Sequence, residues 1–461
     1  MHELDTIIAL SSAKGVGAIA LIRLSGNKSI PIVEQFFSKK NLSILESHTI
    51  HFGTFSVGED VIDEVVISLY KSPRSYTGED IVEISCHGSS YIINNIIQSC
   101  IVAGARLAQA GEFTQRAFLH GKLDLSQAEA VADLIAAESK AAHDIALLQM
   151  RGGIAYQLKA LRSSLIEFAA LIELELDFAE EDVEFADRTS LIQLLQTTQK
   201  ELRTMAESFR LGNAIKNGIP VAIVGKPNAG KSTLLNTLLQ EDRAIVSSIA
   251  GTTRDTIEET LTIDGYLFRF IDTAGLRESN DEIEKIGIER SNAAIAKAEI
   301  IIYILGLDST DNLSGVKEEI SKVTAKAGNH KEIIIVGNKE DRSSPKIIQG
   351  WRNSLPKALI AISAKQHTGI NELKKLLVAA VEQVNHTENA VIVTNQRHYE
   401  ALMKAETAVA EVITNLHLGI PSDLVTQDIK EALYYIGTIT GDIDIDKDIL
   451  GTIFGKFCIG K

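Results

Sequence analysis

Apolar and polar positions in the first part of the chain predict a domain that mixes strands and helices. Short apolar runs bounded by glycine and polar residues predict β-strands at 6–10, 17–24, 63–69 and 80–86. A longer run with helical spacing predicts a helix at 91–103. We therefore expect an α+β domain over residues 1–118.

The spacing becomes helical over residues 119–215, which are rich in Ala, Leu and Glu. Ser126 and Glu129 are spaced like a capping box and predict a helix start at that point. Helical spacing returns over residues 381–461, with its clearest stretch at 399–416. Two helical regions that flank a stretch of another kind predict a helical domain interrupted by an insertion.

The inserted stretch, residues 216–380, alternates apolar strands with helices, as chains with a parallel sheet do. Its strands are predicted at 219–224, 268–271, 300–305 and 332–337. The predicted fold class is a multidomain α+β and α/β chain, in which an N-terminal α+β domain is followed by a helical domain with an inserted, mainly parallel α/β domain. The predicted divisions are 1–118, 119–215, 216–380 and 381–461.

The composition fits a globular chain in a reducing compartment. Of the 461 residues, 45% are hydrophobic and 23% are charged, and no apolar run is long enough to span a bilayer. The first residues carry no basic segment of a signal peptide, so we expect a cytoplasmic protein that does not use a membrane. The three cysteines, Cys86, Cys100 and Cys458, form no Cys-x-x-Cys pair, which disfavours a zinc site or a disulfide framework.

The formal net charge of −15 bears on nucleic-acid partners. Proteins that bind nucleic acids usually carry a basic face, because phosphate neutralisation supplies much of their affinity. If this chain acts on RNA, its acidity indicates that a partner protein does much of the holding. The alternative is that the acidity serves only solubility.

The segment GKPNAGKS at 225–232 fits the phosphate-binding loop pattern G-x-x-x-x-G-K-[ST]. It follows the predicted strand 219–224 and precedes a helical segment at 233–239, which is the context that the motif requires. Backbone N–H groups of such a loop surround phosphate oxygens. Lys231 is expected to reach the β- and γ-phosphates, and the Ser232 hydroxyl to bind Mg²⁺.

Further motifs follow in the order expected of a guanine-nucleotide site. The segment GTTRD offers Thr253 as a second Mg²⁺ ligand, and DTAG at 272–275 offers an aspartate for the metal's water shell. NKED at 338–341 ends in Asp341, which can accept hydrogen bonds from both N1–H and N2–H of guanine. SAK at 363–365 can support the base through a backbone N–H. The residues expected to bind GTP are Asn228, Ala229, Gly230, Lys231, Ser232, Thr233, Ser247, Ser248, Ile249, Ala250, Gly251, Thr252, Thr253, Asp272, Thr273, Ala274, Gly275, Asn338, Lys339, Asp341, Ser363, Ala364 and Lys365.

The hydrolytic apparatus of Ras-type GTPases is incomplete in this sequence. Leu276 stands where those proteins place the glutamine that orients water, and no arginine finger is identifiable. The Asn228 side chain, inside the phosphate loop, could coordinate a monovalent cation near the phosphates. The acidic run 281–284 could supply a water-orienting carboxylate, although a solvated helix face is the usual meaning of such a run.

Two charged residues interrupt the apolar strands of the N-terminal region. Arg23 and Glu83 each need a partner or a ligand if they are buried. The simpler interpretation is that both positions face outward from the strands.

The whole chain resembles the MnmE (TrmE) family of bacterial tRNA modification GTPases. The resemblance is carried by GKPNAGKS, IAGTTRD, DTAGLR, EKIGIER and NKED, by LIRLSG, TGEDIVEISCHG and GEFTQRAFLHGKLDLSQAEAVADLI, and by the final FCIGK. It implies an N-terminal tetrahydrofolate-binding and dimerisation domain, a helical domain and an inserted P-loop GTPase domain. It also implies a homodimer in which GTP hydrolysis, stimulated by K⁺ as the two G domains meet, drives a conformational cycle.

The resemblance further implies a reaction on tRNA. Together with MnmG (GidA), a flavoprotein that holds FAD, the chain would add an aminomethyl or carboxymethylaminomethyl group to C5 of the wobble uridine. The carbon would come from 5,10-methylene-tetrahydrofolate. The tRNA itself would be held mainly by the flavoprotein partner.

The residues of the family's sites can be placed on this sequence one by one. Its folate contacts fall on Arg23, Glu83, Lys122 and Lys461. Its K⁺ ligands fall on Asn228, Ser247, Ile249 and Thr252, beside the Mg²⁺ ligands Ser232 and Thr253. Catalytic roles fall on Lys231, on Glu284 as the water-orienting carboxylate, and on Cys458. For Cys458 two interpretations stay open, a small buried hydrophobe and a thiol near the folate.

Other functions remain open on the nucleotide motifs alone. A ribosome-assembly or signalling GTPase, acting by binding alone, would share the phosphate loop and NKED but would need neither FCIGK nor a folate-binding domain. A chain that keeps the fold but has lost the modification chemistry is a third interpretation. Folate titration separates the first two, and nucleoside analysis of tRNA identifies the third.

Overall fold

The chain divides into two compact units in the computed structural model. The first comprises Met1–Ile135, Leu148–Gln199 and Lys404–Lys461, and the second comprises Ala136–Leu147 and Lys200–Met403. The residues that the structure describes are 5–177, 188–241, 258–271, 292–308, 313–328, 331–355, 357–382, 392–418, 420 and 422–442. The division into four segments predicted above is finer than these two units and stays a prediction.

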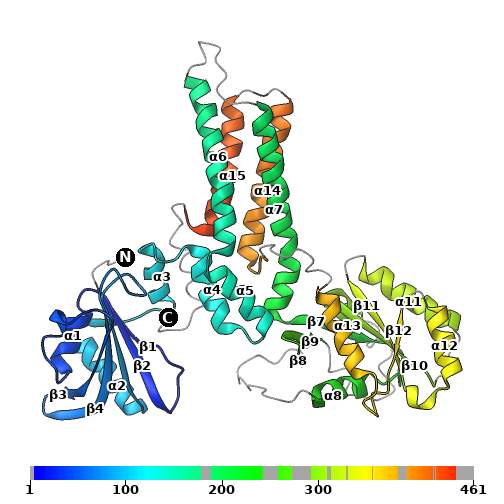
Figure 1. Ribbon diagram of the computed structural model, residues 1–461, viewed down its shortest axis with the longest axis horizontal. Helices are drawn as coiled ribbons and strands as arrows, with labels where there is room; N and C mark the ends of the chain where they lie inside the picture. The colour runs from blue at the N-terminus through cyan, green and yellow to red at the C-terminus, as the bar shows by residue number, and fades with distance from the viewer. Residues whose placement is uncertain are drawn as a thin grey trace. The chain divides into compact units, whose positions relative to one another are not determined.

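A six-stranded sheet lies in the N-terminal part of the first unit, in the order β3-β4-β5-β2-β1-β6 (Figure 1). Its strands are β1 Thr6–Leu10, β2 Gly17–Ser25, β3 Thr49–Val57, β4 Asp60–Tyr70, β5 Ile81–Gly88 and β6 Ala105–Leu107. Neighbouring strands are antiparallel except β1 and β6, which run parallel.

The two faces of this sheet differ because side chains alternate along each strand. Helices α1 Ser29–Phe36 and α2 Ser90–Val102 pack on one face, and the 3-10 helix Leu42–Ile44 adjoins α1. The strand residues that enter this core include Ile22, Leu24, Val65, Ile67, Leu69 and Ile84. On the other face, α3 Glu112–Leu119 brings Phe113 against Ile7 and Ala9 of β1. Arg23 and Glu83, one position away from core residues, therefore face away from α1 and α2.

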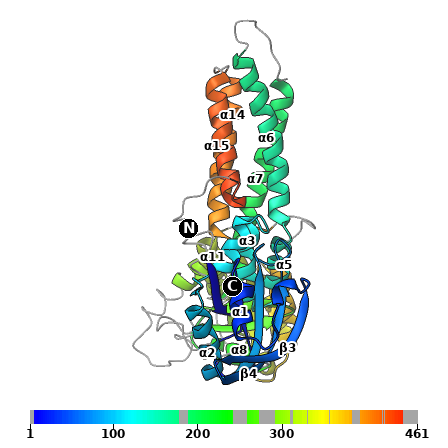
Figure 2. The same ribbon diagram turned by 90° about the vertical axis from the view of Figure 1, so that its left-hand side faces the viewer.

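Long helices form much of the remaining described chain. They are α4 Leu125–Ala136, α5 Lys140–Met150, α6 Gly153–Asp177, α7 Arg188–Asn217, α14 Gln396–His417 and α15 Ser422–Thr440. In the first unit α6 packs along α15, and the side-chain amide of Gln199 on α7 donates to Glu406 on α14 over 2.9 Å. Both views show α6, α7, α14 and α15 side by side (Figures 1 and 2).

The start of α4 corrects one prediction. The expected capping box, Ser126 with Glu129, is wrong. Asp124 accepts the backbone N–H of Gln127 over 2.9 Å, and the Gln127 side-chain oxygen accepts the backbone N–H of Asp124 over 2.9 Å. Both pairs have the same spacing, but the carboxylate of Asp124 immediately precedes the first helical residue and so reaches the free N–H groups there.

A second six-stranded sheet forms the centre of the second unit, in the order β12-β11-β10-β7-β9-β8. Its strands are β7 Ile219–Val224, β8 Glu259–Ile263, β9 Tyr266–Phe270, β10 Ile300–Gly306, β11 Glu332–Asn338 and β12 Leu359–Ala361. All neighbours are parallel except the β8–β9 pair. The mainly parallel sheet predicted for residues 216–380 is thus confirmed.

Helices cover both faces of this second sheet. Helices α8 Lys231–Glu241 and α13 Ile370–Glu382 pack on one side, while α11 Leu313–Ala327 and α12 Pro345–Ser354 pack on the other. The 3-10 helix Glu340–Arg342 follows β11. Every residue of β10 is buried, as expected for a central strand covered on both faces.

The fold class predicted from the sequence is confirmed as a multidomain α+β and α/β architecture, with an α+β N-terminal region, long helices and a mainly parallel sheet. Within the described ranges, no helix combines the length and the apolar character that a membrane crossing needs.

Candidate functional site

The phosphate loop, residues 225–232, connects the carboxyl end of β7 to the start of α8. Gly225 has a φ of +153°, and a Cβ there would lie 2.1 Å from the backbone oxygen of Ile304. Gly230 has a φ of +99°, and a Cβ there would lie 2.1 Å from the side-chain nitrogen of Asn338. Both positions therefore require glycine, because the loop lies against β10 and β11 without room for a side chain.

Lys231 is the first residue of α8 and returns over the loop. Its Nζ donates to the backbone oxygens of Gly225 over 2.8 Å and Lys226 over 2.9 Å. Burial lowers the pKa of the ammonium, because its partners are carbonyl dipoles and carry no full negative charge. The arrangement holds a cation beside the N–H groups of a helix start, which together favour a phosphate group.

Asn338, at the end of β11, joins the phosphate loop to the loop at 363–365, which is predicted to support the base. The residue is 3% exposed. The amide nitrogen donates to the backbone oxygen of Ala229 over 2.9 Å, and the amide oxygen accepts the backbone N–H of Ala364 over 3.0 Å. The groups predicted to recognise phosphate and base are thus held in one frame by a buried side chain.

Asp341, which the sequence predicts to bind the base, is held by a neighbouring hydroxyl. The Ser363 hydroxyl donates to its Oδ1 over 2.6 Å, which fixes the orientation of the carboxylate. The carboxylate has roughly four lone-pair positions, so acceptors remain for two N–H groups of guanine. The structure therefore brings Asn338, Asp341 and Ala364 into one hydrogen-bonded region, and their roles toward GTP stay predictions.

Lys339 and Asp308 line a cavity next to the phosphate loop, and the sequence analysis did not identify Asp308. Lys339 has a φ of +65°, and its Nζ lies 3.1 Å from Oδ1 of Asp308, which follows β10. The cavity has a volume of about 230 Å³ and is lined by Lys226, Pro227, Asn228, Ala229, Tyr303, Ile304, Leu305, Gly306, Asp308, Val316 and Lys339. The signal available in the sequence was that Asp308 lies just past a fully buried strand. The carboxyl ends of parallel strands meet at the same edge of the sheet, where ligands bind.

Several predicted residues lie outside the described ranges, so their roles stay predictions. They are Ser247, Ser248, Ile249, Ala250, Gly251, Thr252, Thr253, Asp272, Thr273, Ala274, Gly275, Leu276, Glu284, Cys458 and Lys461. Within those ranges, His, Cys, Asp and Glu side chains form no cluster able to hold a metal ion. The described candidates for Mg²⁺ and K⁺ are the Ser232 hydroxyl and the exposed Asn228 amide, oxygen donors of the type that such cations accept.

Arg23 and Glu83 form the second candidate site, on β2 and β5 of the N-terminal sheet. The strand register pairs them directly, and Arg23 Nη2 lies 2.7 Å from Glu83 Oε1. The side chains are 20% and 17% exposed. Each charge therefore has the partner that its strand position requires.

Two aromatic residues missed by the sequence analysis flank this ion pair. The Arg23 guanidinium lies 5.4 Å from the ring centroid of Tyr76 and 5.7 Å from that of Phe113. The Tyr76 hydroxyl lies 2.8 Å from the Thr114 hydroxyl, and burial raises the pKa of Tyr76, so the phenol stays neutral. The only signal in the sequence was their position, since neither residue is charged: Tyr76 directly precedes the TGED segment, and Phe113 lies within GEFTQRAF.

Lys122 lies near the same loop as Tyr76. A Cβ at Gly78 would lie 3.3 Å from its Cε, so the lysine stem runs over Gly78. The side chain is exposed, and the backbone N–H donates to the Ala117 oxygen over 2.8 Å. The structure thus places the described folate candidates in the N-terminal part of the first unit, with Arg23 and Glu83 in direct contact.

Comparisons with known proteins identify the family of the chain. Residues 6–122 match the model of the GTP-binding protein TrmE N-terminus, and residues 125–458 match that of the MnmE helical domain. Among similar proteins are those named tRNA modification GTPase MnmE from Cytophaga hutchinsonii (49% identical, 100% of this chain and 98% of that protein), Flavobacterium psychrophilum (52%, 99% and 99%) and Bacteroides thetaiotaomicron (50%, 99% and 99%). The matched domains and the identity over the full length show that this chain belongs to the MnmE (TrmE) family of tRNA modification GTPases.

Proposed function

We propose that this chain hydrolyses GTP to drive a modification of the wobble uridine in certain tRNAs. With the flavoprotein MnmG and its FAD, it adds an aminomethyl or carboxymethylaminomethyl group to C5 of that uridine, and 5,10-methylene-tetrahydrofolate donates the carbon. The observation that carries the proposal is the buried Asn338 bridge, which joins the phosphate loop at Ala229 to Ala364. The residue next to Ala364, Ser363, holds the carboxylate of Asp341. The reaction on tRNA is supported by the relatives, which share the whole length of the chain.

The chain's own residues give the nucleotide site its selectivity and charge. Asp341 accepts the two N–H donors of guanine, and adenine lacks this pair. The ammonium of Lys231 lies opposite the β- and γ-phosphates, and the first turn of α8 directs N–H groups at them. Ser232 and Thr253 would hold Mg²⁺, and Asn228, Ser247, Ile249 and Thr252 would hold K⁺. Bound there, the two cations would supply positive charge against the charge that develops on the phosphoryl group. Glu284 orients the attacking water.

The ion pair on the N-terminal sheet suits a reduced pterin with a glutamate tail. Glu83 can accept hydrogen bonds from the amino and ring N–H groups of the pterin, while Arg23 keeps that carboxylate ionised. Lys122 and Lys461 supply positive charge for the carboxylates of the tail. The aromatic neighbours of Arg23 make one side of the site apolar, as the flat pterin ring requires.

The open face of the N-terminal sheet supports self-association. Ile19, Ile50, Phe52 and Val66 are 71%, 70%, 69% and 36% exposed and lie on β2, β3 and β4. Such a patch on a sheet favours burial against another protein surface. We propose that a second copy covers it, which makes the chain a homodimer. The acidity of the chain supports a tRNA held mainly by the flavoprotein. The sparse cysteines, without a Cys-x-x-Cys pair, support a cytoplasmic location.

Reconstitution tests this proposal directly. The full chain is mixed with the flavoprotein, GTP, methylene-tetrahydrofolate labelled in the transferred carbon, glycine or ammonium, and tRNA that lacks the modification. We expect label on the wobble uridine with the natural chain and none with Lys231→Ala. Label that is equal with both proteins would remove the GTP-driven step. A GTPase that acts by binding alone would hydrolyse GTP and transfer no label.

A further inference from the structure

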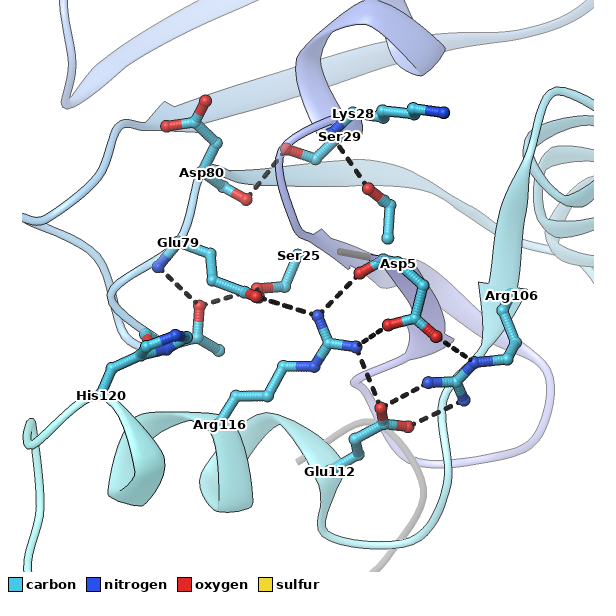
Figure 3. Close-up of polar contacts among 12 residues, drawn as sticks. Asp5, Ser25, Lys28, Ser29, Glu79, Asp80, Arg106, Glu112, Arg116 and His120 are labelled. Atoms are coloured by element: carbon cyan, nitrogen blue, oxygen red, sulfur yellow. Dashed lines mark hydrogen bonds and ion pairs between the residues drawn. The ribbon is translucent and has the colours of Figure 1, made fainter. Parts of the chain in front are cut away.

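A set of charged side chains in the N-terminal region, which we call the Arg116 cluster, consists of Asp5, Glu79, Arg106, Glu112 and Arg116 (Figure 3). Arg116 on α3 is its centre, with a side chain only 9% exposed. Its Nη1 donates to the Asp5 backbone oxygen over 2.9 Å and to Glu79 Oε1 over 3.0 Å. Its Nη2 donates to Asp5 Oδ1 over 2.6 Å and to Glu112 Oε1 over 3.1 Å. One side chain thus joins the segment before β1, the loop at 71–80 and α3.

Glu79 links Arg116 to Ser25 on β2 and lies in the loop at 71–80. The Ser25 hydroxyl donates to Glu79 Oε2 over 2.6 Å, so the Thr77 hydroxyl, 2.7 Å away, donates to Ser25. The His120 Nδ1 donates to the Thr77 backbone oxygen over 2.7 Å (Figure 3). The loop is therefore held from β2, from Arg116 and from the end of α3.

The two elements that Arg116 joins are the two that carry the aromatic neighbours of Arg23. Tyr76 belongs to the loop and directly precedes Thr77, and Phe113 belongs to α3 and directly follows Glu112. The Tyr76 hydroxyl also contacts Thr114 of α3 over 2.8 Å. The distance between the loop and the helix therefore fixes how the two rings enclose the guanidinium. A network of buried charges keeps the loop and the helix at a fixed distance, because moving them apart would leave buried charges without a partner.

We propose that Arg116 is a positioning residue for folate: it holds the loop at 71–80 against α3 so that Tyr76, Phe113 and Arg23 form a preorganised pterin slot. This inference depends on the folate binding put forward above. A positioned slot binds more tightly, because the ligand need not order the loop and the helix when it enters. The alternative is that the cluster only stabilises the fold.

Arg106 offers a matched control. It lies in the same cluster, bonds Asp5 over 2.8 Å and Glu112 over 2.6 Å, and is 42% exposed. Within the described chain, its side-chain hydrogen bonds go to Asp5, Leu107 and Glu112 and not to Glu79, so removing it weakens the cluster and leaves the bond between Arg116 and the loop in place. Arg116→Gln and Arg106→Gln therefore remove the same charge from the same set of residues, and only the first removes a bond between the cluster and the loop at 71–80.

The experiment is calorimetric titration of 5-formyl-tetrahydrofolate into the full chain, well below the unfolding temperature of each variant. We expect Arg116→Gln to weaken binding by at least about tenfold, and Arg106→Gln by less than about threefold, since preorganisation is lost only in the first. Arg116→Lys should not restore affinity, because an ammonium cannot bond Asp5 and Glu79 in the fork geometry of a guanidinium. If Arg116→Gln does not fold, Glu79→Ala removes the acceptor of the Arg116 N–H in the loop and should show the same loss.

A double-mutant cycle with Tyr76→Phe separates positioning from stability. If Arg116 acts through the slot, Tyr76→Phe weakens binding in the natural chain and has little further effect beside Arg116→Gln. Equal losses for the two arginine variants, no loss for Arg116→Gln, or fully additive effects in the cycle would overturn the inference. Absence of binding by the natural chain would instead overturn the proposed folate function, and the inference with it.

Discussion

Replacing Asp341 by asparagine tests the guanine site most sharply. The variant keeps the size of the side chain and the hydrogen bond from Ser363, which is 2.6 Å long. It turns an amide N–H₂ toward the N1–H and N2–H donors of guanine. Two hydrogen bonds to a charged acceptor contribute about 1.5–3 kcal/mol each, so the loss is about 3–6 kcal/mol. We therefore expect GDP affinity to fall roughly 10²- to 10⁴-fold.

The assay is a titration with fluorescent GDP, followed by competition with unlabelled GDP and with xanthosine diphosphate. Xanthine carries a carbonyl at C2, which accepts from the new amide, so Asp341→Asn should prefer xanthosine diphosphate. Glu340→Gln removes the neighbouring charge and should change GDP affinity by less than about threefold, as surface substitutions usually do. Unchanged GDP affinity in Asp341→Asn, or no gain for xanthosine diphosphate, would refute the assignment of the base-reading carboxylate.

Three further predictions concern buried groups. Asn338→Ala leaves a backbone carbonyl and a backbone N–H unpaired, which costs about 1–3 kcal/mol each. The variant should therefore unfold at a lower urea concentration, measured by the fluorescence of Trp351, the only tryptophan, and an unchanged urea midpoint would contradict the bridge. Gly225→Ala should destabilise the same transition by roughly 1–3 kcal/mol, whereas Gly315→Ala, which has open space on α11, should leave it unchanged or raised. Burial raises the pKa of Cys86 to about 11, so its thiolate is scarce near neutrality. Alkylation of Cys86 in the folded protein, followed by mass spectrometry, should accelerate only as the pH rises toward that value. Fast alkylation at neutral pH would disprove the burial of Cys86.

The features that the sequence predicted are those encoded locally. The phosphate loop is recognisable because its glycines, lysine and serine are close in sequence and follow an apolar strand. β10 is recognisable because a central strand of a parallel sheet is apolar at every position. β3 was not predicted, because its apolar positions are divided between a buried face and an open one, where Ile50 and Phe52 are exposed.

Features that depend on distant contacts could not be predicted in the same way. Arg23 and Glu83 were recognised as charges in need of a partner, but their pairing follows from the register of β2 against β5. The contact between Arg116 and Asp5 joins residues 111 positions apart, and no local pattern marks it. The error at α4 has a different origin: Asp124 with Gln127 and Ser126 with Glu129 have the same spacing, and only the observed helix start distinguishes them.

The central claim is that this chain uses GTP to modify the wobble uridine of tRNA. Nucleoside analysis of tRNA from a strain that lacks the gene tests this claim most directly. We predict that the 5-aminomethyl or 5-carboxymethylaminomethyl uridines are absent from that strain, return with the natural chain and do not return with Lys231→Ala. Wobble uridines that are fully modified in the deletion strain, or restored equally by Lys231→Ala, would contradict the account.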